Sequence, residues 1–548
     1  MSPIYRSDQA QLSTAAEAAP GGYMDSGERA TLSNATTLTG AHVAGSRSIT
    51  VASTTGYVAG DYVQIEATLN AVVELRRVQR VVSATVLNLD YPTAFYHAGT
   101  VAVSEAGAGA FSGTTFQTFL PGVYETIATP DLQPEILPFH FLSVSSLRNA
   151  SRVYRGRQTF AGSVPNMILL NGYPLRFGLG GVRTVASAVA GGSSTSTAIA
   201  RKGVRSIAMT DGTSFANGDF IEIERTGTNP EVRQIISGAL GVGAQTFVVN
   251  YPFMYEHASG ITVAEVAASP TYTHTLVQTN QLDAMTWHLL MRDTDETAAN
   301  DFIRKFVGGI ANRTTLSADE GGMLMFSWDD VLFLDMVHNQ TAHSSMAGTD
   351  PMPKSSSGLR APSGVGTSMP HAAGALGTPT FPTNAPYYFS QGDVSFFGVT
   401  FARIRNFRLE INNNVDPRYY VRDLGTLRSP SELLEQKREY SLTATVAMPD
   451  SLAATAATRT LFKELILEGN YDAGNIGFDV TLTFTRGTSD TITVTMPPAA
   501  AATGLDAQGC YFRRAQHSIG TENPVQVDGE IFVRAASFVI VDSVGVYP

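Results

Sequence analysis

The chain has 548 residues, of which 43% are apolar and 16% are charged, and its formal net charge is −11. The apolar share is ample for packed cores and excludes a disordered chain. The acid excess argues against a surface that wraps nucleic acid, which needs clustered Lys and Arg. A single cysteine, Cys510, excludes an internal disulfide and a multi-cysteine zinc site.

The remaining composition favours a mainly β protein. Gly occurs 50 times, and Thr, Ser and Val are abundant, which is typical of many short strands joined by tight turns. No apolar run approaches the length of a membrane span, and the N-terminal residues lack the apolar core of a signal peptide. We therefore expect no membrane insertion, and a chain that is made in a cytosol.

Two stretches of the chain, 47–105 and 205–265, repeat each other almost without gaps. The first includes RSITVASTTGYVAGDYVQIE and LDYPTAFYHAGTVAVSE, and the second includes RSIAMTDGTSFANGDFIEIE and VNYPFMYEHASGITVAE. Each copy has the pattern of a small β module, with a Gly-Asp corner followed by a strand of period-two alternation. Because His97 and His257 recur at matching positions, we predict that they hold the same structural turn.

The repeats divide the chain into a discontinuous host and two insertions. Seams rich in Gly, Ala and Ser flank them, for example at 106–113 and 188–198. A Pro-, Gly- and Ser-rich loop at 341–386 interrupts the host, and a loop of this length is usually functional. The predicted division is a host of residues 1–40, 110–190 and 270–548, with inserted β modules at 41–106 and 198–268.

Three elements of the host can be predicted in chain order. Residues 155–183 have the composition of a turn-rich segment around a short apolar core. Residues 396–411 are dense in aromatic and β-branched residues and end at Asn412 before an Asp-Pro turn, which fits a strand at the edge of a sheet. Residues 453–468 are predicted to form a helix, because Ser451 and its neighbours supply N-cap signals and Gly469 ends the apolar stripe.

Strands near the C-terminus alternate between apolar and hydroxylated residues. In 439–448 the apolar set begins at Tyr440, and in 478–496 it begins at Phe478. A Ser/Thr face without Lys or Arg suits a surface past which a polyanion slides without binding, and the alternative is an ordinary solvent-facing sheet. The candidate residues for a surface that faces a channel are Ser441, Thr443, Thr445, Thr481, Thr483 and Thr485.

Catalytic signatures are largely missing. There is no nucleophile elbow, no phosphate-binding loop and no complete dinucleotide-binding fingerprint, so we expect no enzyme and no cofactor. Asp335, His338 and His343 could hold a metal, but without a helical register a solvated loop is the better interpretation. Glu222 and Glu224 could converge on one strand face as glycosidase carboxylates do, although a solvated strand face is favoured.

The order of the host segments resembles that of the tail tube (major tail) proteins of long-tailed bacteriophages. The matching segments are YRSDQAQLSTAAEAAPGG, GSVPNMILLNGYPLRFGLGGV, YTHTL, FVGGIANRTTLSADEGGMLMFSWDDV, FARIRNFRLEINNN and REYSLTATVAMPD, followed by one helix and a Thr-rich hairpin. The resemblance spans most of the host. The two modules depart from a minimal member of this family.

The resemblance implies a sandwich-like or barrel-like β fold with one flanking helix, and a structural virion protein with no catalysis. It implies rings, commonly of six subunits, that stack into a tube for DNA ejection. The implied partners are other copies of the chain, the tape measure protein and viral DNA inside the lumen, and other tail proteins at the tube ends. The chain would assemble in the host cytoplasm and remain in the virion tail, with the modules on the outer wall.

By the same analogy, loop 341–386 and residues 1–36 are candidates for contacts between rings. A different class of function stays open beside this one, namely a virion or cell-surface β protein whose repeated modules bind glycans.

Overall fold

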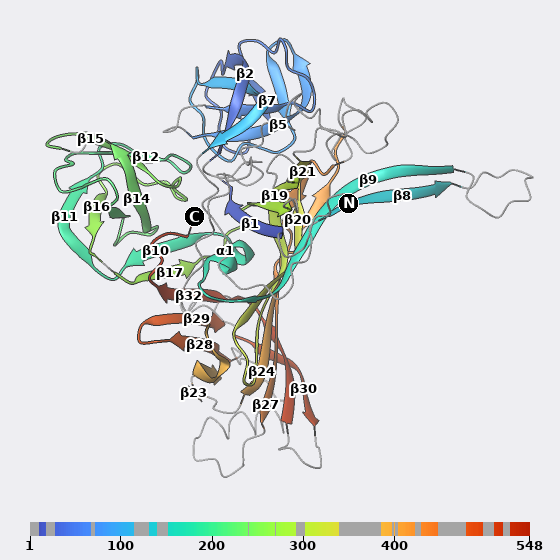
Figure 1. Cartoon of the computed structure of the whole chain (residues 1–548), viewed down its shortest axis with the longest axis vertical. Helices are drawn as coiled ribbons and strands as arrows, with labels where there is room; N and C mark the ends of the chain where they lie inside the picture. Colours follow the sequence, from blue (N-terminus) through green and yellow to red (C-terminus); the bar gives the residue numbers. More distant parts are fainter. Residues whose placement is uncertain are drawn as a thin grey trace, which may run out of the picture.

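The protein is mainly β, as the sequence predicts. Strands form one large sheet, one seven-stranded sheet (the middle sheet) and two six-stranded sheets (the first and second small sheets), together with the short pair β25 (Asp416–Arg418) and β26 (Glu432–Leu434) (Figure 1). The computed structural model describes residues 10–17, 28–66, 72–113, 131–139, 152–238, 241–268, 270–291, 302–338, 385–396, 399–400, 404–421, 429–447, 478–496, 509–518 and 526–547.

The large sheet has 11 strands, and eight of them form one antiparallel path. In spatial order, this path runs through β30 (Tyr511–Ser518), β31 (Gln526–Val533), β27 (Glu439–Ala447), β24 (Ile404–Asn412), β19 (Phe302–Asp319), β20 (Met325–Phe333), β9 (Arg152–Ile168) and β8 (Asp131–Phe139). The strands off this path are β1 (Ala10–Ala16), β18 (Met285–Met291) and β21 (Asp335–His338).

The eight-strand path contains the same arrangement twice. The hairpin β30–β31 is followed by β27 and β24, and the hairpin β19–β20 is followed by β9 and β8. In both halves the second strand of the hairpin borders the next strand of the path, and the hairpin comes later in the chain than the two strands it joins. The eight-strand path of the large sheet therefore consists of two similar four-strand units side by side.

The middle sheet packs face to face against the large sheet. Its spatial order is β10 (Val182–Ala186), β17 (Tyr272–Leu276), β32 (Ser537–Asp542), β29 (Asp490–Met496), β28 (Val480–Arg486), β22 (Gly392–Phe396) and β23 (Val399–Thr400). Phe407 of the large sheet and Phe484 of the middle sheet meet with ring centroids 5.6 Å apart. The two sheets share one apolar core, which also holds the buried Trp287 and Trp328.

The two small sheets have the same strand order, each around its own apolar cluster. The first runs through β2 (Glu28–Thr37), β7 (Ala102–Gly113), β4 (Tyr62–Ile65), β5 (Glu74–Ser83), β6 (Val86–Leu89) and β3 (Ser48–Thr50). The second runs through β11 (Val189–Thr195), β16 (Thr262–Val266), β13 (Phe220–Ile223), β14 (Glu231–Gly238), β15 (Gln245–Val249) and β12 (Ser206–Met209).

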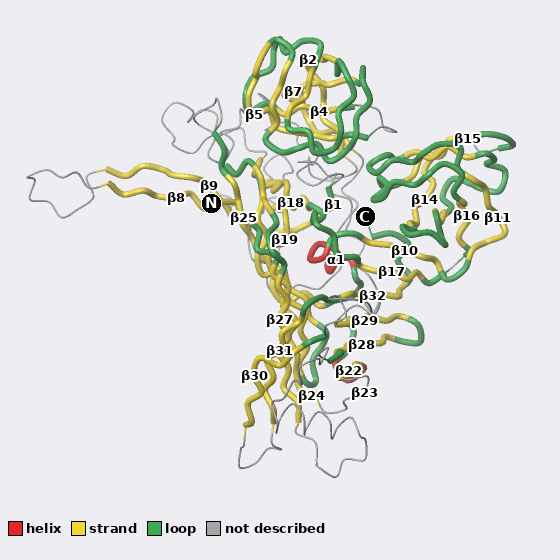
Figure 2. The backbone as a smooth tube through the Cα atoms, turned by 180° about the vertical axis from the view of Figure 1, so that it is seen from behind, coloured by secondary structure: helices red, strands yellow, loops and turns green. Residues whose placement is uncertain are grey.

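Each small sheet contacts the rest of the protein through the same face. In the first small sheet, Tyr62 and Leu75 belong to an apolar cluster with Leu334 and other residues of the large sheet. The matching residues of the second small sheet, Phe220 and Val232, pack with Tyr272 of the middle sheet. Figure 2 shows both small sheets beside the body formed by the other two sheets.

One helix, α1 (Tyr173–Leu179), lies where the sequence indicates only a turn-rich segment, and that prediction is wrong. The helix spans 7 residues between Gly172 and Gly180, and Gly180 has a φ of 113° that favours glycine. Seven residues are too few to show helical periodicity in the sequence. The helix predicted at 453–468 and nearly all of the loop predicted at 341–386 lie outside the described residues.

The stretch 396–411, predicted as one strand at a sheet edge, is divided between two sheets. β23 is the last strand of the middle sheet, whereas β24 lies inside the large sheet. β24 pairs with β27 on one side and with β19 on the other. The turn after Asn412 indicated an edge, but β19 comes from about a hundred residues earlier in the chain, and no local pattern reveals such a distant partner.

The shared core predicts a large cost for removing one ring. Phe484→Ala should lower the free energy of unfolding by roughly 3–5 kcal/mol, because it leaves a cavity between the two sheets. Denaturant-induced unfolding measures this loss. Thr485→Ala, on the outer face of the same strand, is the matched control and should change stability by less than about 1 kcal/mol. Equal losses for the two variants would contradict a core shared by the two sheets.

Candidate assembly surfaces

The hydroxylated strands have the predicted alternation. Alternate residues of β27 and β28 are buried, namely Tyr440, Leu442, Ala444, Val480, Leu482 and Phe484. Their hydroxylated neighbours are half-buried or exposed, namely Ser441, Thr443, Thr445, Thr481, Thr483 and Thr485. The period-two pattern therefore predicts correctly which face of each strand is buried.

The two hydroxyl sets face away from each other. Leu442 of β27 and Leu482 of β28 point into the same core, from the large and the middle sheet respectively. Because alternate residues of a strand point to opposite faces, Thr443 and Thr483 lie on opposite outer sides of the paired sheets. One channel can therefore be lined by only one of the two sets, which the strand patterns alone did not reveal.

The outer face of the large sheet carries charges between its hydroxyl groups. Thr443 is paired in register with Arg408 on one side and with Glu530 on the other. Four arginines near this face form ion pairs, namely Arg313 with Asp329 (4.0 Å), Arg405 with Glu320 (2.9 Å), Arg408 with Glu410 (3.7 Å) and Arg513 with Glu530 (3.7 Å). Arg514, in register with Glu530, instead donates a hydrogen bond to the side-chain oxygen of Gln516. The alternation along one strand could not reveal these charges, because the charged residues lie on neighbouring strands.

Compared with the outer face of the large sheet, the outer face of the middle sheet has fewer charged side chains and more hydroxyl groups. Thr483 is paired in register with Thr493, and Thr493 with Val539. The hydroxyl oxygens of Thr483 and Thr493 lie 3.5 Å apart. Thr275 continues the row beside Val539 on the next strand, and Asp393 ends it on the other side.

A two-stranded ribbon of β8 and β9 projects from the body (Figure 1). Its apolar side chains are exposed: Ile136 by 63%, Leu137 by 37%, Val153 by 60% and Tyr154 by 45%. Leu137 faces Tyr154 across the ribbon, while Ile136 lies on the opposite face. Both faces of the ribbon thus expose apolar groups, which marks it as a surface for contact with another molecule.

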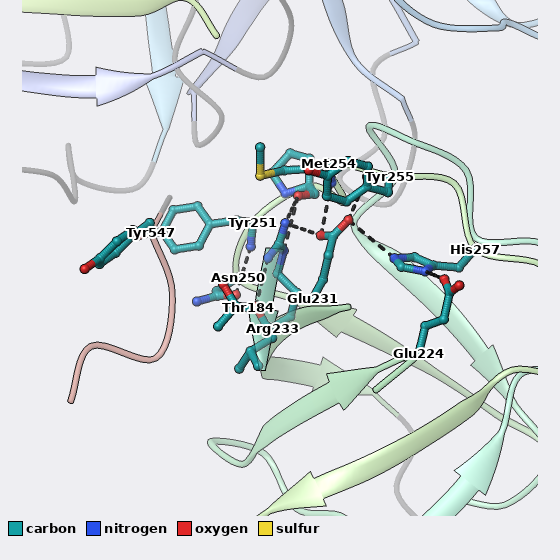
Figure 3. A network of polar contacts seen from close by, with 12 residues as sticks. Thr184, Glu224, Glu231, Arg233, Asn250, Tyr251, Met254, Tyr255, His257 and Tyr547 are labelled. Carbon is teal, nitrogen blue, oxygen red and sulfur yellow. Dashed lines mark hydrogen bonds and ion pairs between the residues drawn. The ribbon is translucent and has the colours of Figure 1, made fainter. Parts of the chain in front are cut away.

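Figure 3 shows a polar network at the turn between β15 and β16 of the second small sheet. The buried Glu231 carboxylate contacts the Arg233 guanidinium at 2.5 Å and accepts a hydrogen bond from the backbone N–H of Tyr255 at 2.6 Å. His257 lies between two carboxylates, with Nδ1 at 2.7 Å from Glu224 and Nε2 at 3.4 Å from Glu231. The network ties the turn to the two strands that precede it.

The first small sheet contains the same network. Glu74 contacts Arg76 at 2.9 Å and accepts the backbone N–H of Phe95 at 2.5 Å. His97 again lies between two carboxylates, Glu66 at 3.2 Å and Glu74 at 3.3 Å. Both histidines are fully buried, so the prediction of one shared structural turn is consistent with their contacts.

The two networks shift the pKa values of the residues that form them. Burial alone would lower the pKa of His97, but the Glu66 and Glu74 carboxylates, which accept hydrogen bonds from the protonated ring, outweigh this effect and raise the pKa to about 9. Burial opposes a charged Glu74, yet the neighbouring Arg76 and His97 hold the pKa of Glu74 below its usual value. The pKa of His257 is raised in the same way, against the effect of burial, by Glu231 and Glu224.

Glu222 and Asp335, which the sequence favoured for a solvated strand face and a solvated loop, are both buried, so those two interpretations are wrong. Glu222 accepts a hydrogen bond from Arg225 at 2.6 Å, whereas Glu224 contacts His257, so the possible convergence of these two carboxylates is absent. Asp335 is buried against Tyr62. Among the described residues, no group of three or more His, Cys, Asp or Glu side chains could hold a metal ion. His343 and the side chain of His338 lie outside the described residues.

One arrangement that sequence reasoning missed has the residue types of a hydrolase triad. Thr184 Oγ1 lies 2.9 Å from Nδ1 of His274, and Nε2 of His274 lies 3.3 Å from Asp542. All three residues are buried, and His274 also stacks on Tyr547 with ring centroids 3.9 Å apart. The contacts hold the C-terminal segment against the middle sheet and give a substrate no access to Thr184.

A small cavity of about 140 Å³ lies between the second small sheet and the body. Charged residues that line the cavity already form ion pairs with other side chains. Arg176 contacts Asp283 at 2.7 Å, and Arg233 contacts Glu231 at 2.5 Å. Pockets for small molecules usually have about 300–1,000 Å³. The cavity is therefore too small for a substrate of ordinary size.

The comparisons with known proteins point to a structural role. A family model described as phage tail tube protein matches residues 143–531. A search among curated proteins found no match. Within the described residues, no helix has both the length and the apolar character that crossing a membrane requires.

The histidine network predicts a pH dependence of stability. Because the pKa of His97 in the folded protein is about 9 and its ordinary value is 6.5, its protonation stabilises the fold fully below about pH 6.5. This stabilisation is lost as the pH rises through about 9. The thermal midpoint of His97→Gln should therefore lie below that of the unchanged protein at pH 6 to 7, and the gap should narrow by pH 10.

His42→Gln is the matched control, because burial lowers the pKa of His42 and leaves it neutral over this range. Its effect on the thermal midpoint should be independent of pH between 7 and 10. A gap for His97→Gln that stays constant or widens up to pH 10 would contradict the protonated state of His97.

Proposed function

Because the chain belongs to the phage tail tube protein family, we propose that its copies assemble into stacked rings that form the channel for DNA ejection. The chain is a structural component of the virion tail. Assembly takes place in the host cytoplasm. The tape measure protein and viral DNA occupy the lumen in turn, and other tail proteins bind at the tube ends. The chain itself carries out no catalysis.

The observation that carries this proposal is the large sheet, whose eight-strand path ends in two edge strands. These are β30 and β8, and among the described residues of the subunit neither has a partner on its outer side. Joining the large sheets of neighbouring subunits into one barrel removes the edges and covers apolar surface. The exposed Val153 and Tyr154 of the ribbon support such contacts, since water disfavours them.

We place the outer face of the large sheet, with Ser441, Thr443 and Thr445, toward the lumen. The face contains arginines, but Arg408 and Arg513 each lie within 4 Å of a carboxylate of the same sheet. A paired arginine releases few counterions from DNA, so DNA gains little by binding there. The hydroxyl groups of the opposite set, on the middle sheet, then face away from the lumen.

The number of subunits in a ring follows from the repeated strand order. The resemblance to tail tube proteins implies six subunits. The large sheet of this chain, however, has two similar four-strand units, so three chains present as many units as six chains with one unit each. The circumference of a barrel follows its strand number, so we propose rings of three chains. A ring image with six identical subunits would contradict this count.

The two small sheets contain the predicted modules at residues 41–106 and 198–268, but each also includes one strand outside those bounds, β2 in the first and β11 in the second. Their identical strand order and their shared polar network support a common origin. Both contact the body through one face, and we propose that their remaining surface forms part of the outer wall of the tube. The predicted host of residues 1–40, 110–190 and 270–548 includes β2 and part of β11, which belong to the small sheets instead. We propose that loop 341–386 and residues 1–36 contact adjacent rings.

The opposite orientation of the hydroxyl sets gives a test with an internal control. Thr443→Lys adds an unpaired cation to the proposed channel wall and should slow DNA ejection, because the new charge binds phosphates. Thr483→Lys adds the same charge on the opposite side and should leave ejection unchanged. DNA release from purified particles, triggered in vitro, measures both.

Both variants should form tubes of normal length under negative-stain microscopy, which separates a defect of passage from a defect of assembly. Slow ejection for Thr483→Lys with normal ejection for Thr443→Lys would assign the lumen to the middle sheet instead. A protein that stays monomeric and binds glycans would overturn the tail tube proposal itself.

A further inference from the structure

The turn that carries the repeated histidine also carries an aromatic residue at a matching position. It spans 91–97 in the first small sheet and 251–257 in the second, and the aromatic residue is Phe95 or Tyr255. In each copy its backbone N–H donates to the buried carboxylate of the polar network, at 2.5 Å in the first small sheet and at 2.6 Å in the second (Figure 3). The network therefore fixes the position of the aromatic residue in both copies.

Phe95 packs against the second small sheet. A Cβ on Gly203 would lie 2.8 Å from two carbons of the Phe95 ring, and Val204 packs against the same ring. The next residue of the turn, Tyr96, has the guanidinium of Arg201 over its ring, 4.2 Å from the centroid, where the positive charge is attracted to the aromatic face. Phe95 and Gly203 are buried. The turn of the first small sheet thus contacts the segment that precedes β12 of the second.

Tyr255 makes the same kind of contact with the body. A Cβ on Gly181 would lie 2.5 Å from the Tyr255 hydroxyl, so this side chain also approaches a glycine closely. The guanidinium of Arg183 in β10 lies 5.9 Å from the centroid of the Tyr255 ring. Met254 packs against the core shared by the large and middle sheets. In both places the turn therefore contacts a glycine of the neighbouring unit and an arginine two positions from that glycine.

The two contacts are connected through the second small sheet. Gly203, on which Phe95 lies, donates its N–H to the carbonyl of Phe253 at 2.8 Å. Phe253 precedes Tyr255 by two residues in the same turn. The segment that receives the first small sheet is thus hydrogen-bonded to the turn that contacts the body.

We propose that this repeated turn is a docking surface, which joins the first module to the second and the second module to the body. The buried network holds each aromatic residue in place, and the facing glycine leaves room for it because glycine has no Cβ. Buried aromatic side chains contribute much of the stability of a contact between two units. These contacts add to the apolar face through which each small sheet meets the body. The inference rests on the proposed division into host and modules, and it does not require ring formation.

Two alanine variants test this assignment on different neighbours. Phe95→Ala removes the ring that lies on the second small sheet, and Tyr255→Ala removes the ring that lies against the body. Because each neighbour loses its cover, amide hydrogen exchange should become about tenfold faster at residues 203–204 in Phe95→Ala and at residues 182–184 in Tyr255→Ala. Phe95→Ala should leave exchange at 182–184 unchanged.

Two glycines of nearly equal φ provide the matched control. Gly203 has a φ of 87° and Gly45, its match in the first small sheet, has a φ of 88°, so alanine strains the backbone similarly at both. Among the described residues, no atom lies within 4 Å of the Cβ position of Gly45. Gly203→Ala should therefore lower the thermal midpoint by more than Gly45→Ala does. In a Phe95→Ala background this difference should disappear, because the ring that meets the new methyl group is gone.

Persistent protection of β4 and β13 shows that both small sheets remain folded in each variant. If Phe95→Ala unfolds the first small sheet, the comparison of Gly203→Ala with Gly45→Ala decides alone. Equal shifts for the two glycine variants, or faster exchange in Phe95→Ala only within the first small sheet, would overturn the docking proposal. Tube formation is scored separately by negative-stain microscopy, and its failure in the unchanged protein would count against the tail tube proposal alone.

Discussion

The packing of the large sheet against the middle sheet is the constraint on which the rest of the structure depends. Each sheet contributes one apolar face to a single core, so each has one polar face left, and the two polar faces point in opposite directions. Phe407 and Phe484 meet in this core. Any channel formed by several copies must therefore choose between two chemically different walls, one with ion pairs among hydroxyl groups and one made mainly of Thr and Val.

Much of the fold could be predicted from the sequence, because its signals are local. Alternation along β27 and β28 gave the correct buried faces, and the repeat gave two small sheets whose strand order proves identical. What the sequence could not provide is the identity of distant partners. β24 has the features of an edge strand, yet β19 covers its free side, and the charges beside Thr443 come from Arg408 and Glu530 on other strands.

The polar contacts were predictable only in part, for a similar reason. His97 and His257 recur in the repeat, which indicated a shared role, but the two carboxylates around each come from residues some tens of positions earlier. Asp335, which the sequence analysis weighed as a metal ligand and assigned to a solvated loop, is instead buried and contacts Arg77.

The central claim is that the large sheet of each subunit forms the wall of a common channel. A reconstruction of assembled tubes by electron cryo-microscopy tests it most directly, because strands of neighbouring subunits can be traced around the lumen. The account predicts a continuous barrel in which β8 and β30 of adjacent chains lie at the subunit boundaries and Thr443 faces the channel. A lumen lined by Thr483 and Thr493 of the middle sheet, or by the small sheets, would contradict it.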